Sequence, residues 1–403
     1  MLISLSFIFL VGLGLAAVCQ SLKLPRIIGM LLTGILLGPY ALNLLDPSIL
    51  AISAELRRMA LIIILLKAGL SLNLSDLKRV GRPAVMMACV PASFEILGFL
   101  IFAPHILGIT RVEAAVMGAV LSAVSPAVVI PRMVGLIEKG YGTDKGIPQM
   151  IMAGASCDDI FVIVLFSTFA AMAQGGAVHG TDLFNVPVSI ILGIALGVGA
   201  GYALSLFFEK SYVCGRYVRN STKVIILLGI SFFLMEAETW LKGMVPVSGL
   251  LAVVSTACVL KRKSIPGVSS RLSEKFGKLW IAAEVILFVL VGAAVDIRYM
   301  FEAGFPALVM IATALVFRSL GTALCLTGTA LDRKERLFCV IAYLPKATVQ
   351  AAIGSVPLAL GLPCGALVLS VAVLAIMITA PLGALGMDLT YKDFLKQNGS
   401  TPA

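Results

Sequence analysis

Two adjacent aspartates in the middle of a long apolar run are the residues most able to do chemistry in this sequence. Asp158 and Asp159 lie in the string Gly-Ala-Ser-Cys-Asp-Asp-Ile-Phe, which covers residues 154–161. An ionised group at the centre of a bilayer costs roughly 2.5–3.5 kcal/mol, so buried acids pair with cations or line a water-filled path. A helix break or a polar packing patch is the structural alternative, but neighbouring side chains about 100° apart on a helix cannot both cap one helix end. We therefore interpret the pair as a site for a cation or a proton.

Five further charged residues fall inside apolar runs. They are the acids Glu95 and Glu284 and the bases Lys67, Arg318 and Lys346. Lys67 can reach the membrane interface with its long side chain, and Glu284 can serve a helix contact. Without these two, three acids still face two bases. The surplus carboxylate requires a cation or a proton as its partner.

The buried bases differ in what they can do. Arg318 stays charged and cannot carry a proton, so we expect it to form a structural ion pair with Glu95. A buried lysine can release a proton. Two roles are therefore open for Lys346: it pairs with Asp158 and gives up a proton when a cation arrives, or it compensates the charge at the ends of a broken helix.

Prolines interrupt two of the apolar runs that flank these charges. Pro126 follows Ser125 in the run 122–129, and Pro345 precedes Lys346 in the run 344–350. A proline cannot donate its backbone hydrogen bond, and its ring crowds the preceding turn. Broken helices at mid-depth are tolerated where they line a cavity, and their freed carbonyls can bind a small cation. We expect a discontinuous helix at each proline.

The elements that must position these residues are membrane helices. The chain has 403 residues, of which 60% are hydrophobic and only 13% are charged, too few charges for a water-facing surface. A bilayer core about 30 Å thick needs about 20 apolar residues per helix. Hydropathy predicts about thirteen transmembrane helices, at 2–20, 24–41, 53–73, 83–104, 112–134, 147–173, 186–208, 223–240, 244–260, 278–297, 305–327, 337–360 and 363–387.

The basic residues orient these helices. Most of the 31 lysines and arginines fall in the odd-numbered loops and the C-terminal tail, whereas the even-numbered loops hold few. The positive-inside rule therefore predicts an N-terminus outside the cell and a C-terminus in the cytoplasm. The net charge of +10 is explained by orientation, and we expect no nucleic-acid partner.

Thirteen helices divide into six, a linker and six, which start on opposite sides of the membrane. The two broken helices, 112–134 and 337–360, then occupy equivalent positions, as do 83–104 with Glu95 and 305–327 with Arg318. This is the plan of transporters with inverted repeats. The predicted fold class is an all-α membrane protein with two inverted six-helix repeats and crossed discontinuous helices.

Enzymatic classes find little support. The eight cysteines are scattered singly, and the two histidines fall near helix ends or in a loop, so no zinc or redox site is indicated. An intramembrane aspartyl protease needs acids on separate segments, and no span of chain is left for a soluble domain. We expect a protein that is not an enzyme and has no cofactor.

Four motifs together resemble a known family. They are the aspartate pair, the Ser-Pro-Ala-Val-Val break, the string Pro-Lys-Ala-Thr-Val-Gln-Ala-Ala at 345–352, and Leu-Pro-Arg-Ile-Ile-Gly at 24–29 leading to Gly38-Pro39. Over nearly the whole chain they look like the cation:proton antiporter superfamily. The string at 345–352 with Glu95 and Arg318 resembles the NHA-type sodium/proton antiporters.

The resemblance implies a homodimer with two kinds of domain. The core domain for ion translocation would comprise 83–173 and 305–387, and the dimerisation domain 1–73 and 186–297 with a linker helix. Asp159 would be the essential ion-binding carboxylate with Asp158 beside it, and Thr348 and the backbone near Ser125 would complete the cavity. Electrogenic relatives carry a lysine where this chain has Arg318, a departure that favours an electroneutral cycle.

We therefore expect exchange of Na⁺ or Li⁺ for H⁺ by alternating access at the aspartate pair, in the bacterial inner (plasma) membrane. A sodium-coupled symporter of organic solutes is the main alternative, although few donors remain for a substrate anion. A cation channel is a third possibility, distinguished by currents far above the turnover rate of a carrier.

Overall fold

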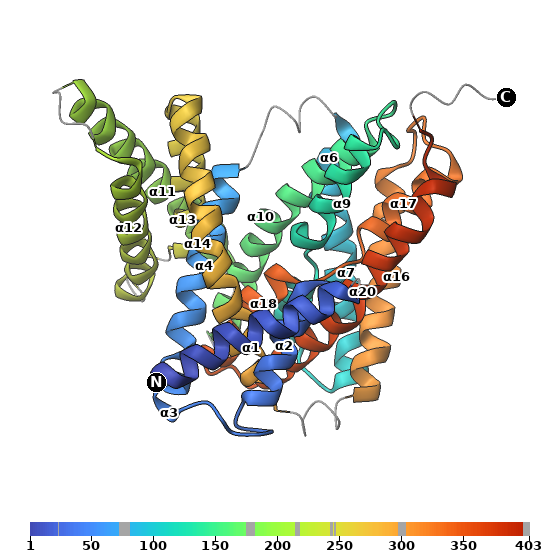
Figure 1. Cartoon of the computed structure of the whole chain (residues 1–403), viewed down its shortest axis with the longest axis horizontal. Coiled ribbons are helices and arrows are strands. Elements are labelled where there is room, and N and C mark those ends of the chain that lie inside the picture. Colours follow the sequence, from blue (N-terminus) through green and yellow to red (C-terminus); the bar gives the residue numbers. More distant parts are fainter. Residues whose placement is uncertain are drawn as a thin grey trace. The chain divides into compact units, whose positions relative to one another are not determined.

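The structure of the protein is a computed structural model that describes residues 1–22, 24–71, 81–174, 182–213, 218–241, 245, 247–296 and 304–397. The described residues are almost entirely helical (Figure 1). The helices are α1 (Leu2–Ser21), α2 (Arg26–Leu37), α3 (Pro47–Ala51), α4 (Ser53–Ser71), α6 (Arg82–Met87), α7 (Val90–Leu107), α8 (Arg111–Leu121), α9 (Pro126–Glu138), α10 (Ile147–Gln174), α11 (Asp182–Val213), α12 (Asn220–Trp240), α13 (Gly249–Lys263), α14 (Pro266–Ala293), α16 (Gly304–Cys325), α17 (Arg333–Ala342), α18 (Thr348–Gly354), α19 (Val356–Ala359) and α20 (Gly365–Phe394).

These helices have the length and composition of membrane-spanning segments. Within the described part of the chain, 8 helical stretches of at least 18 residues are apolar enough to cross a bilayer. Each span predicted from hydropathy falls on a helix or on a run of short consecutive helices. The predicted class, a helical membrane protein with discontinuous helices, is confirmed.

Packing divides the chain into two compact units. The first contains Met1–Ala51, Asn73–Phe169 and Phe288–Ala403, and the second contains Ile52–Leu72 and Ala170–Leu287. The functional assignment of 83–173 and 305–387 to a translocation core, and of 1–73 and 186–297 to a dimerisation domain, stays a prediction.

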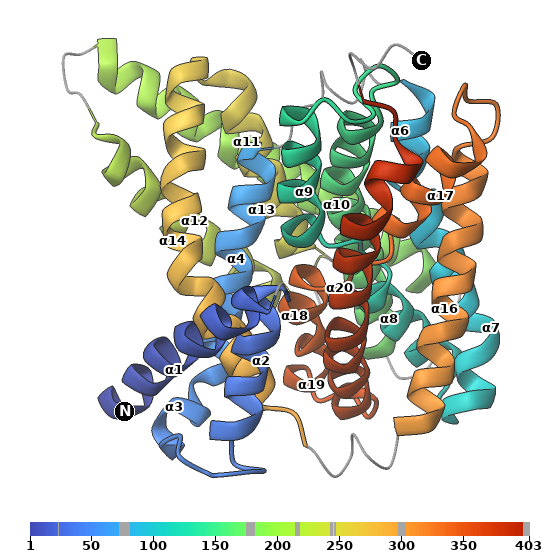
Figure 2. The same ribbon diagram turned by 45° about the vertical axis from the view of Figure 1, so that its right-hand side comes forward.

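The first unit contains two helices that are broken near their middle (Figure 2). The chain leaves helical geometry at 122–125, between α8 and α9, and at 343–347, between α17 and α18. Pro126 is the first residue of α9, and Ser125 before it is extended, with φ −90° and ψ 108°. A residue that precedes proline is disfavoured in the helical region, so the break falls where the sequence predicts it.

The two broken helices begin in the same way. At the start of α8, the Thr110 hydroxyl accepts a hydrogen bond from the Glu113 N–H, and the Glu113 carboxylate accepts one from the Thr110 N–H. Asp332 and Glu335 form the same reciprocal arrangement at the start of α17. Such capping boxes satisfy backbone donors that a helix end leaves free. The equivalent starts agree with the predicted repeat of the two halves.

One break was not predicted. The span expected at 83–104 is interrupted between α6 and α7, at Ala88 and Cys89. Pro91 lies in the first turn of α7. Its ring would crowd the carbonyl of Met87, four residues earlier, and Met87 is the last residue of α6.

Helices α7 and α16 pack closely because small residues line their contact. A Cβ atom at Gly98 of α7 would lie 3.0 Å from the Phe317 ring of α16, and one at Gly321 of α16 would lie 2.9 Å from the Pro91 Cα atom. The interval between these contacts carries Glu95 on α7 and the residue after Phe317, Arg318, on α16. The close crossing therefore brings an acid and a base from distant parts of the sequence together.

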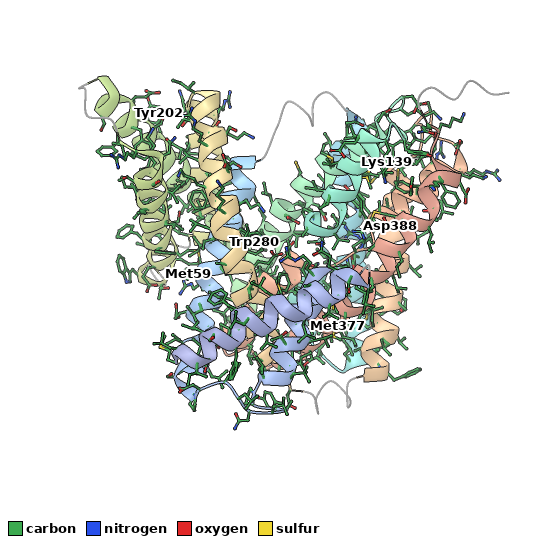
Figure 3. The ribbon with its side chains drawn as sticks, viewed as in Figure 1. Met59, Lys139, Tyr202, Trp280, Met377 and Asp388 are labelled. Carbon is green, nitrogen blue, oxygen red and sulfur yellow. The ribbon has the colours of Figure 1, made fainter. Side chains whose placement is uncertain are left out.

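The end of α20 packs against the segment that joins α9 to α10. Arg132 of α9 forms an ion pair with Asp388 of α20 at 3.1 Å, and the rings of Tyr141 and Tyr391 meet edge to face at 5.1 Å. Lys139 lies over the Tyr391 ring, and Figure 3 labels Lys139 and Asp388 at this end of the unit. These contacts fix the chain at the beginning of α10.

Hydrogen bonds continue this contact along the chain. Gly142 turns with a φ of 64°, and its N–H donates to the carbonyl of Lys396 at 2.8 Å. Lys145 donates to the buried carboxylate of Glu335 at 2.7 Å, a bond that raises the pKa of Lys145. The N–H of Glu335 lowers the pKa of Asp332 by donating to it. The start of α17 is thereby tied to the start of α10.

In the second unit, α11 packs against α13 along a row of glycines at every fourth residue. A Cβ atom at Gly193 would lie 2.6 Å from the Ser248 carbonyl oxygen, and one at Gly201 would lie 2.8 Å from that of Thr256. At Gly197, between them, a Cβ atom would overlap the Ala252 carbonyl oxygen. Small residues at this spacing let two membrane helices approach backbone to backbone.

Replacing Gly197 with valine should therefore separate α11 from α13. Overpacking of a tight interface costs about 1–3 kcal/mol, so we expect a lower midpoint of thermal unfolding for the purified protein in detergent. Gly199→Val is the matched control, since a Cβ atom at Gly199 meets nothing within 4 Å. Equal midpoints for the two variants would contradict the crossing.

Candidate ion-binding site

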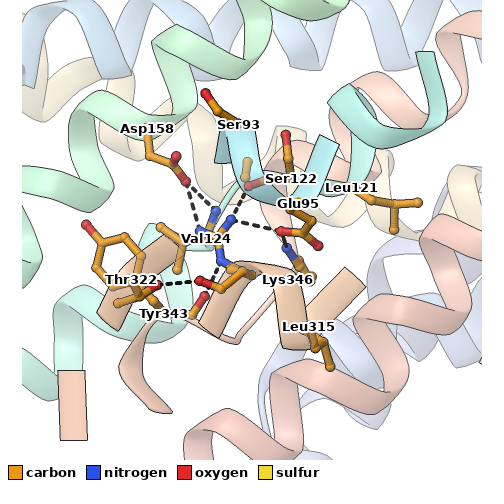
Figure 4. Close-up of polar contacts among 12 residues, drawn as sticks. Ser93, Glu95, Leu121, Ser122, Val124, Asp158, Leu315, Thr322, Tyr343 and Lys346 are labelled. Atoms are coloured by element: carbon orange, nitrogen blue, oxygen red, sulfur yellow. Dashed lines mark hydrogen bonds and ion pairs between the residues drawn. The ribbon is translucent and has the colours of Figure 1, made fainter. Parts of the chain in front are cut away.

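The two adjacent aspartates lie in the middle of α10, inside the first unit. Asp158 is fully buried and Asp159 is 9% exposed. One carboxylate oxygen of Asp158, Oδ2, accepts a hydrogen bond from the Val124 N–H at 2.7 Å and one from Arg318 at 3.2 Å (Figure 4). Val124 belongs to the break between α8 and α9. The aspartate pair therefore adjoins the point where the first broken helix opens.

Arg318 of α16 connects the aspartate to both breaks. Its guanidinium group is fully buried and donates to Glu95 at 2.9 Å as well as to Asp158. It also donates to the carbonyl of Ser122, in the first break, and to the carbonyl of Tyr343, in the second, at 2.5 Å. Hydrogen bonds from a buried guanidinium to charged and backbone acceptors are needed to offset the cost of removing it from water.

Lys346 contacts Glu95. The distance from Lys346 Nζ to Glu95 Oε2 is 2.5 Å, and Arg318 donates to the same oxygen. The expected pair of Glu95 with Arg318 is thus present, with a second cation added. The pairing of Lys346 with Asp158 that the sequence left open is not among the ion pairs of the described residues, so in this structure Lys346 compensates Glu95.

The cluster carries one uncompensated negative charge. Three buried carboxylates, those of Glu95, Asp158 and Asp159, face the two buried cations Arg318 and Lys346. Arg318 contacts Glu95 and Asp158, and Lys346 contacts Glu95. Among the described residues, Asp159 Oδ1 is buried with no hydrogen-bond partner. The surplus charge therefore resides at Asp159.

Two further oxygens of the site are buried and have no hydrogen-bond partner within the described part of the chain. They are Asp158 Oδ1 and the hydroxyl oxygen of Ser125, which ends the first break. Thr348 is buried at the first residue of α18, in the second broken helix. Carboxylate and hydroxyl oxygens are the ligand type that small hard cations prefer. The residue types fit a site for Na⁺ or Li⁺ as a substrate.

Three carbonyls at the first break accept hydrogen bonds from buried side chains. The amide of Gln350 donates to the carbonyls of Leu121 and Ala123 at 3.3 and 2.7 Å, and Arg318 donates to that of Ser122. The carboxylate and hydroxyl oxygens without a hydrogen-bond partner are therefore the first candidates for cation ligands.

The two breaks also contact each other directly. The Ser125 N–H donates to the carbonyl of Pro345 at 2.8 Å. The side-chain oxygen of Gln350 accepts from the Ala347 N–H at 2.8 Å, while its amide reaches the first break. The predicted crossing of the discontinuous helices is therefore stabilised by a bond between their backbones and by one glutamine.

Sequence reasoning missed two residues of this site, Gln350 and Tyr343. Gln350 is fully buried in an apolar run, and a buried amide that needs several partners is a signal that could have identified it. Tyr343 gave a weaker signal, because a tyrosine near a helix end is common in membrane proteins.

Comparisons with known proteins show the family and the fold of the chain. The family model described as sodium/hydrogen exchanger, transmembrane, matches residues 5–388. The chain is 33% identical over 387 residues to sodium/hydrogen exchanger 9B2 of Pongo abelii, covering 94% of this chain and 71% of that protein. It is 34% identical over 383 residues to the protein of the same name from Mus musculus, covering 91% of this chain and 68% of that protein.

A solved structure shows the same fold. The sodium proton antiporter MjNhaP1 from Methanocaldococcus jannaschii superposes with a TM-score of 0.80, over 97% of both chains, at 19% identity. The match of the family model over most of the chain, together with the identity to the two exchangers, identifies the family of this protein. The chain belongs to the sodium/hydrogen exchanger family of membrane proteins.

Proposed function

We propose that this chain exchanges Na⁺ or Li⁺ for H⁺ across a membrane, with Asp158 and Asp159 as the site at which the two substrates compete. Family membership supports the exchange of sodium for protons. The observation that carries the site assignment is the surplus charge at Asp159, a buried carboxylate oxygen without a hydrogen-bond partner in the described chain.

Competition follows from the charge of the cluster. Removing a charge from water is expensive unless it is compensated, so the single surplus negative charge favours the binding of one monovalent cation or one proton. Binding of both would leave the buried cluster with a net positive charge. The site therefore exchanges one substrate for the other, and the protein changes its accessible side only when the site is neutral.

The oxygens around the surplus charge account for cation binding. A sodium ion that leaves water must replace its hydration shell with oxygen ligands. Asp158 Oδ1, Asp159 Oδ1 and the Ser125 hydroxyl supply three that serve no hydrogen bond in the described structure, and Thr348 lies at the start of the second broken helix. We assign these residues as the cation ligands.

One surplus charge also implies exchange of one cation for one proton, which moves no net charge. A membrane potential is worth about 2.3 kcal/mol per elementary charge per 100 mV. We therefore expect an imposed voltage of either sign to leave the equilibrium of exchange unchanged. Exchange of two protons for one cation would shift that equilibrium by about fiftyfold per 100 mV.

The measurement is sodium-dependent proton movement in proteoliposomes, followed with a pH dye at potentials set by potassium gradients and valinomycin. Parallel experiments with Na⁺, Li⁺ and K⁺ define the cation selectivity. A response of the equilibrium pH gradient to voltage contradicts one-for-one exchange but leaves the exchange itself intact.

The setting of this activity is a further part of the proposal. We place the chain in the bacterial inner membrane, and its basic loops support an orientation with the N-terminus outside and the C-terminus in the cytoplasm. A homodimer is expected from the resemblance to the NHA-type antiporters.

A further inference from the structure

Tyr343 lies in the second break, at the end of α17, and touches the ion site in two ways. Its carbonyl accepts a hydrogen bond from the Arg318 guanidinium at 2.5 Å, and its ring lies 5.6 Å from the guanidinium carbon. A cation over an aromatic face is attracted by the ring. Neither contact involves the phenolic hydroxyl.

The hydroxyl of Tyr343 is buried and has no hydrogen-bond partner among the described residues. A buried polar group left without a partner loses the hydrogen bonds it made in water, which makes it rare in native structures. The hydroxyl lies against a position of α10 that has no side chain. At Gly154 of α10, a Cβ atom would overlap the Tyr343 hydroxyl oxygen.

Gly154 precedes Asp158 by one helical turn, so the two positions share a face of α10. In a helix, each side chain leans toward the N-terminus and covers the turn before its own Cα atom. The Asp158 side chain therefore extends over the turn that begins at Gly154, where the Tyr343 hydroxyl lies. Figure 4 shows Asp158 and Tyr343 near the same cluster of polar contacts.

The Asp158 carboxylate has an acceptor to match. Its Oδ2 atom already accepts from Val124 and Arg318, whereas Oδ1 is buried without a hydrogen-bond partner in the described chain. The Tyr343 hydroxyl, a donor without an acceptor, and Asp158 Oδ1, an acceptor without a donor, thus lie on the same face of one turn of α10. A water that bridges two such groups is nearly as favourable as a direct hydrogen bond.

We propose that Tyr343 is a positioning residue of the cation site, whose hydroxyl donates a hydrogen bond to a water that in turn donates to Asp158 Oδ1. Oδ2 is held by Val124 and Arg318, and the bond from Tyr343 fixes the rotation of the carboxylate. Oδ1 keeps a second lone pair for the cation. This inference rests on the proposed function and adds a residue that the motifs did not indicate.

Tyr343→Phe tests the proposal, since it removes the hydroxyl and keeps the ring and the carbonyl on Arg318. We expect the apparent KM for Na⁺ and Li⁺ to rise roughly threefold to tenfold, the effect of one hydrogen bond, with the maximal rate unchanged. The rise in melting temperature produced by a given Na⁺ concentration in detergent should shrink in parallel. Tyr202→Phe is the control, because Tyr202 is 47% exposed in the second unit.

The position of the hydroxyl is tested by a double-mutant cycle with Gly154→Ala. The added methyl overlaps the hydroxyl in the parent protein, but in the Tyr343→Phe background its nearest ring atom is at 3.4 Å. We expect Gly154→Ala to raise the apparent KM for Na⁺ strongly in the parent and less in that background. Equal effects in both backgrounds would overturn the placement of the hydroxyl against α10.

Two other results overturn the proposal. One is a Tyr343→Phe variant with the apparent KM and the Na⁺-induced thermal shift of the parent. The other is a loss of maximal rate at unchanged KM, the sign of a packing role for the ring. If the parent protein itself shows no cation-dependent proton movement, the proposed function fails; if the parent is active and the variant matches it, only the role of Tyr343 fails.

Discussion

Asp159→Asn should reduce Na⁺- and Li⁺-driven proton movement to the level of liposomes without protein. Asparagine has nearly the shape of aspartate but neither its charge nor a group that can gain and lose a proton near neutral pH. It therefore removes the surplus negative charge, the group that both substrates require. The measurement is the pH response of proteoliposomes to added Na⁺ or Li⁺, with equal amounts of folded protein verified by size-exclusion chromatography.

The control is another acid-to-amide change on a helix. Glu274 of α14 has a side chain that is 65% exposed and pairs with Lys278 one turn away. Surface pairs of this kind contribute little, so Glu274→Gln should transport at the parent rate. Persistence of the parent rate in Asp159→Asn would show that the site has been assigned to the wrong carboxylate.

Glu95→Gln should destabilise the protein more than any exposed acid-to-amide change. Glu95 Oε2 accepts from both Arg318 and Lys346, so its neutralisation leaves Arg318 paired with Asp158 and removes the carboxylate that pairs with Lys346. Removing one partner of a buried ion pair costs roughly 3–5 kcal/mol. We expect a thermal unfolding midpoint in detergent several degrees below that of the parent.

A compensating change tests the cause of that loss. Lys346→Met in the Glu95→Gln background removes the buried cation that has lost its paired carboxylate. We expect the double variant to unfold at a higher temperature than Glu95→Gln alone, although Lys346→Met by itself also destabilises. Additive losses would show that the network of buried charges does not determine the stability of the crossing.

Much of this site could be predicted because membrane burial makes charged residues rare. Asp158, Asp159, Glu95, Arg318 and Lys346 stand out in apolar runs, and all of them are buried in one unit. Their number and sign also predicted the surplus carboxylate. Charge counting needs no knowledge of geometry, since the cost of a buried charge applies wherever it lies.

The partners of each charge could not be predicted, because they come from distant segments. Lys346 and Glu95 are separated by 251 residues. From the sequence, Lys346 was expected to pair with Asp158 or to compensate the ends of a broken helix, and only the crossing of the helices shows that it contacts Glu95. The same is true of Gln350, whose acceptors lie in the other broken helix.

Helix breaks were predicted at two prolines and missed at a third. Pro126 and Pro345 mark real breaks, and Pro91 marks one that hydropathy concealed. Pro104 and Pro381 lie inside continuous helices. A proline removes one donor, and whether the helix yields depends on neighbours that can satisfy the freed carbonyl.

Carbonyls of the first break accept hydrogen bonds from side chains far along the sequence, and this has a consequence for the insertion of the chain into the membrane. The carbonyls of Ser122 and Ala123 depend on Arg318 and Gln350, which follow them by 196 and 227 residues. At about 5–20 residues per second of ribosomal synthesis, these donors emerge roughly 10–45 s later. Bare carbonyls are not tolerated in lipid. The amino-terminal half must therefore wait in contact with water or with the insertion machinery until its carboxy-terminal counterpart arrives.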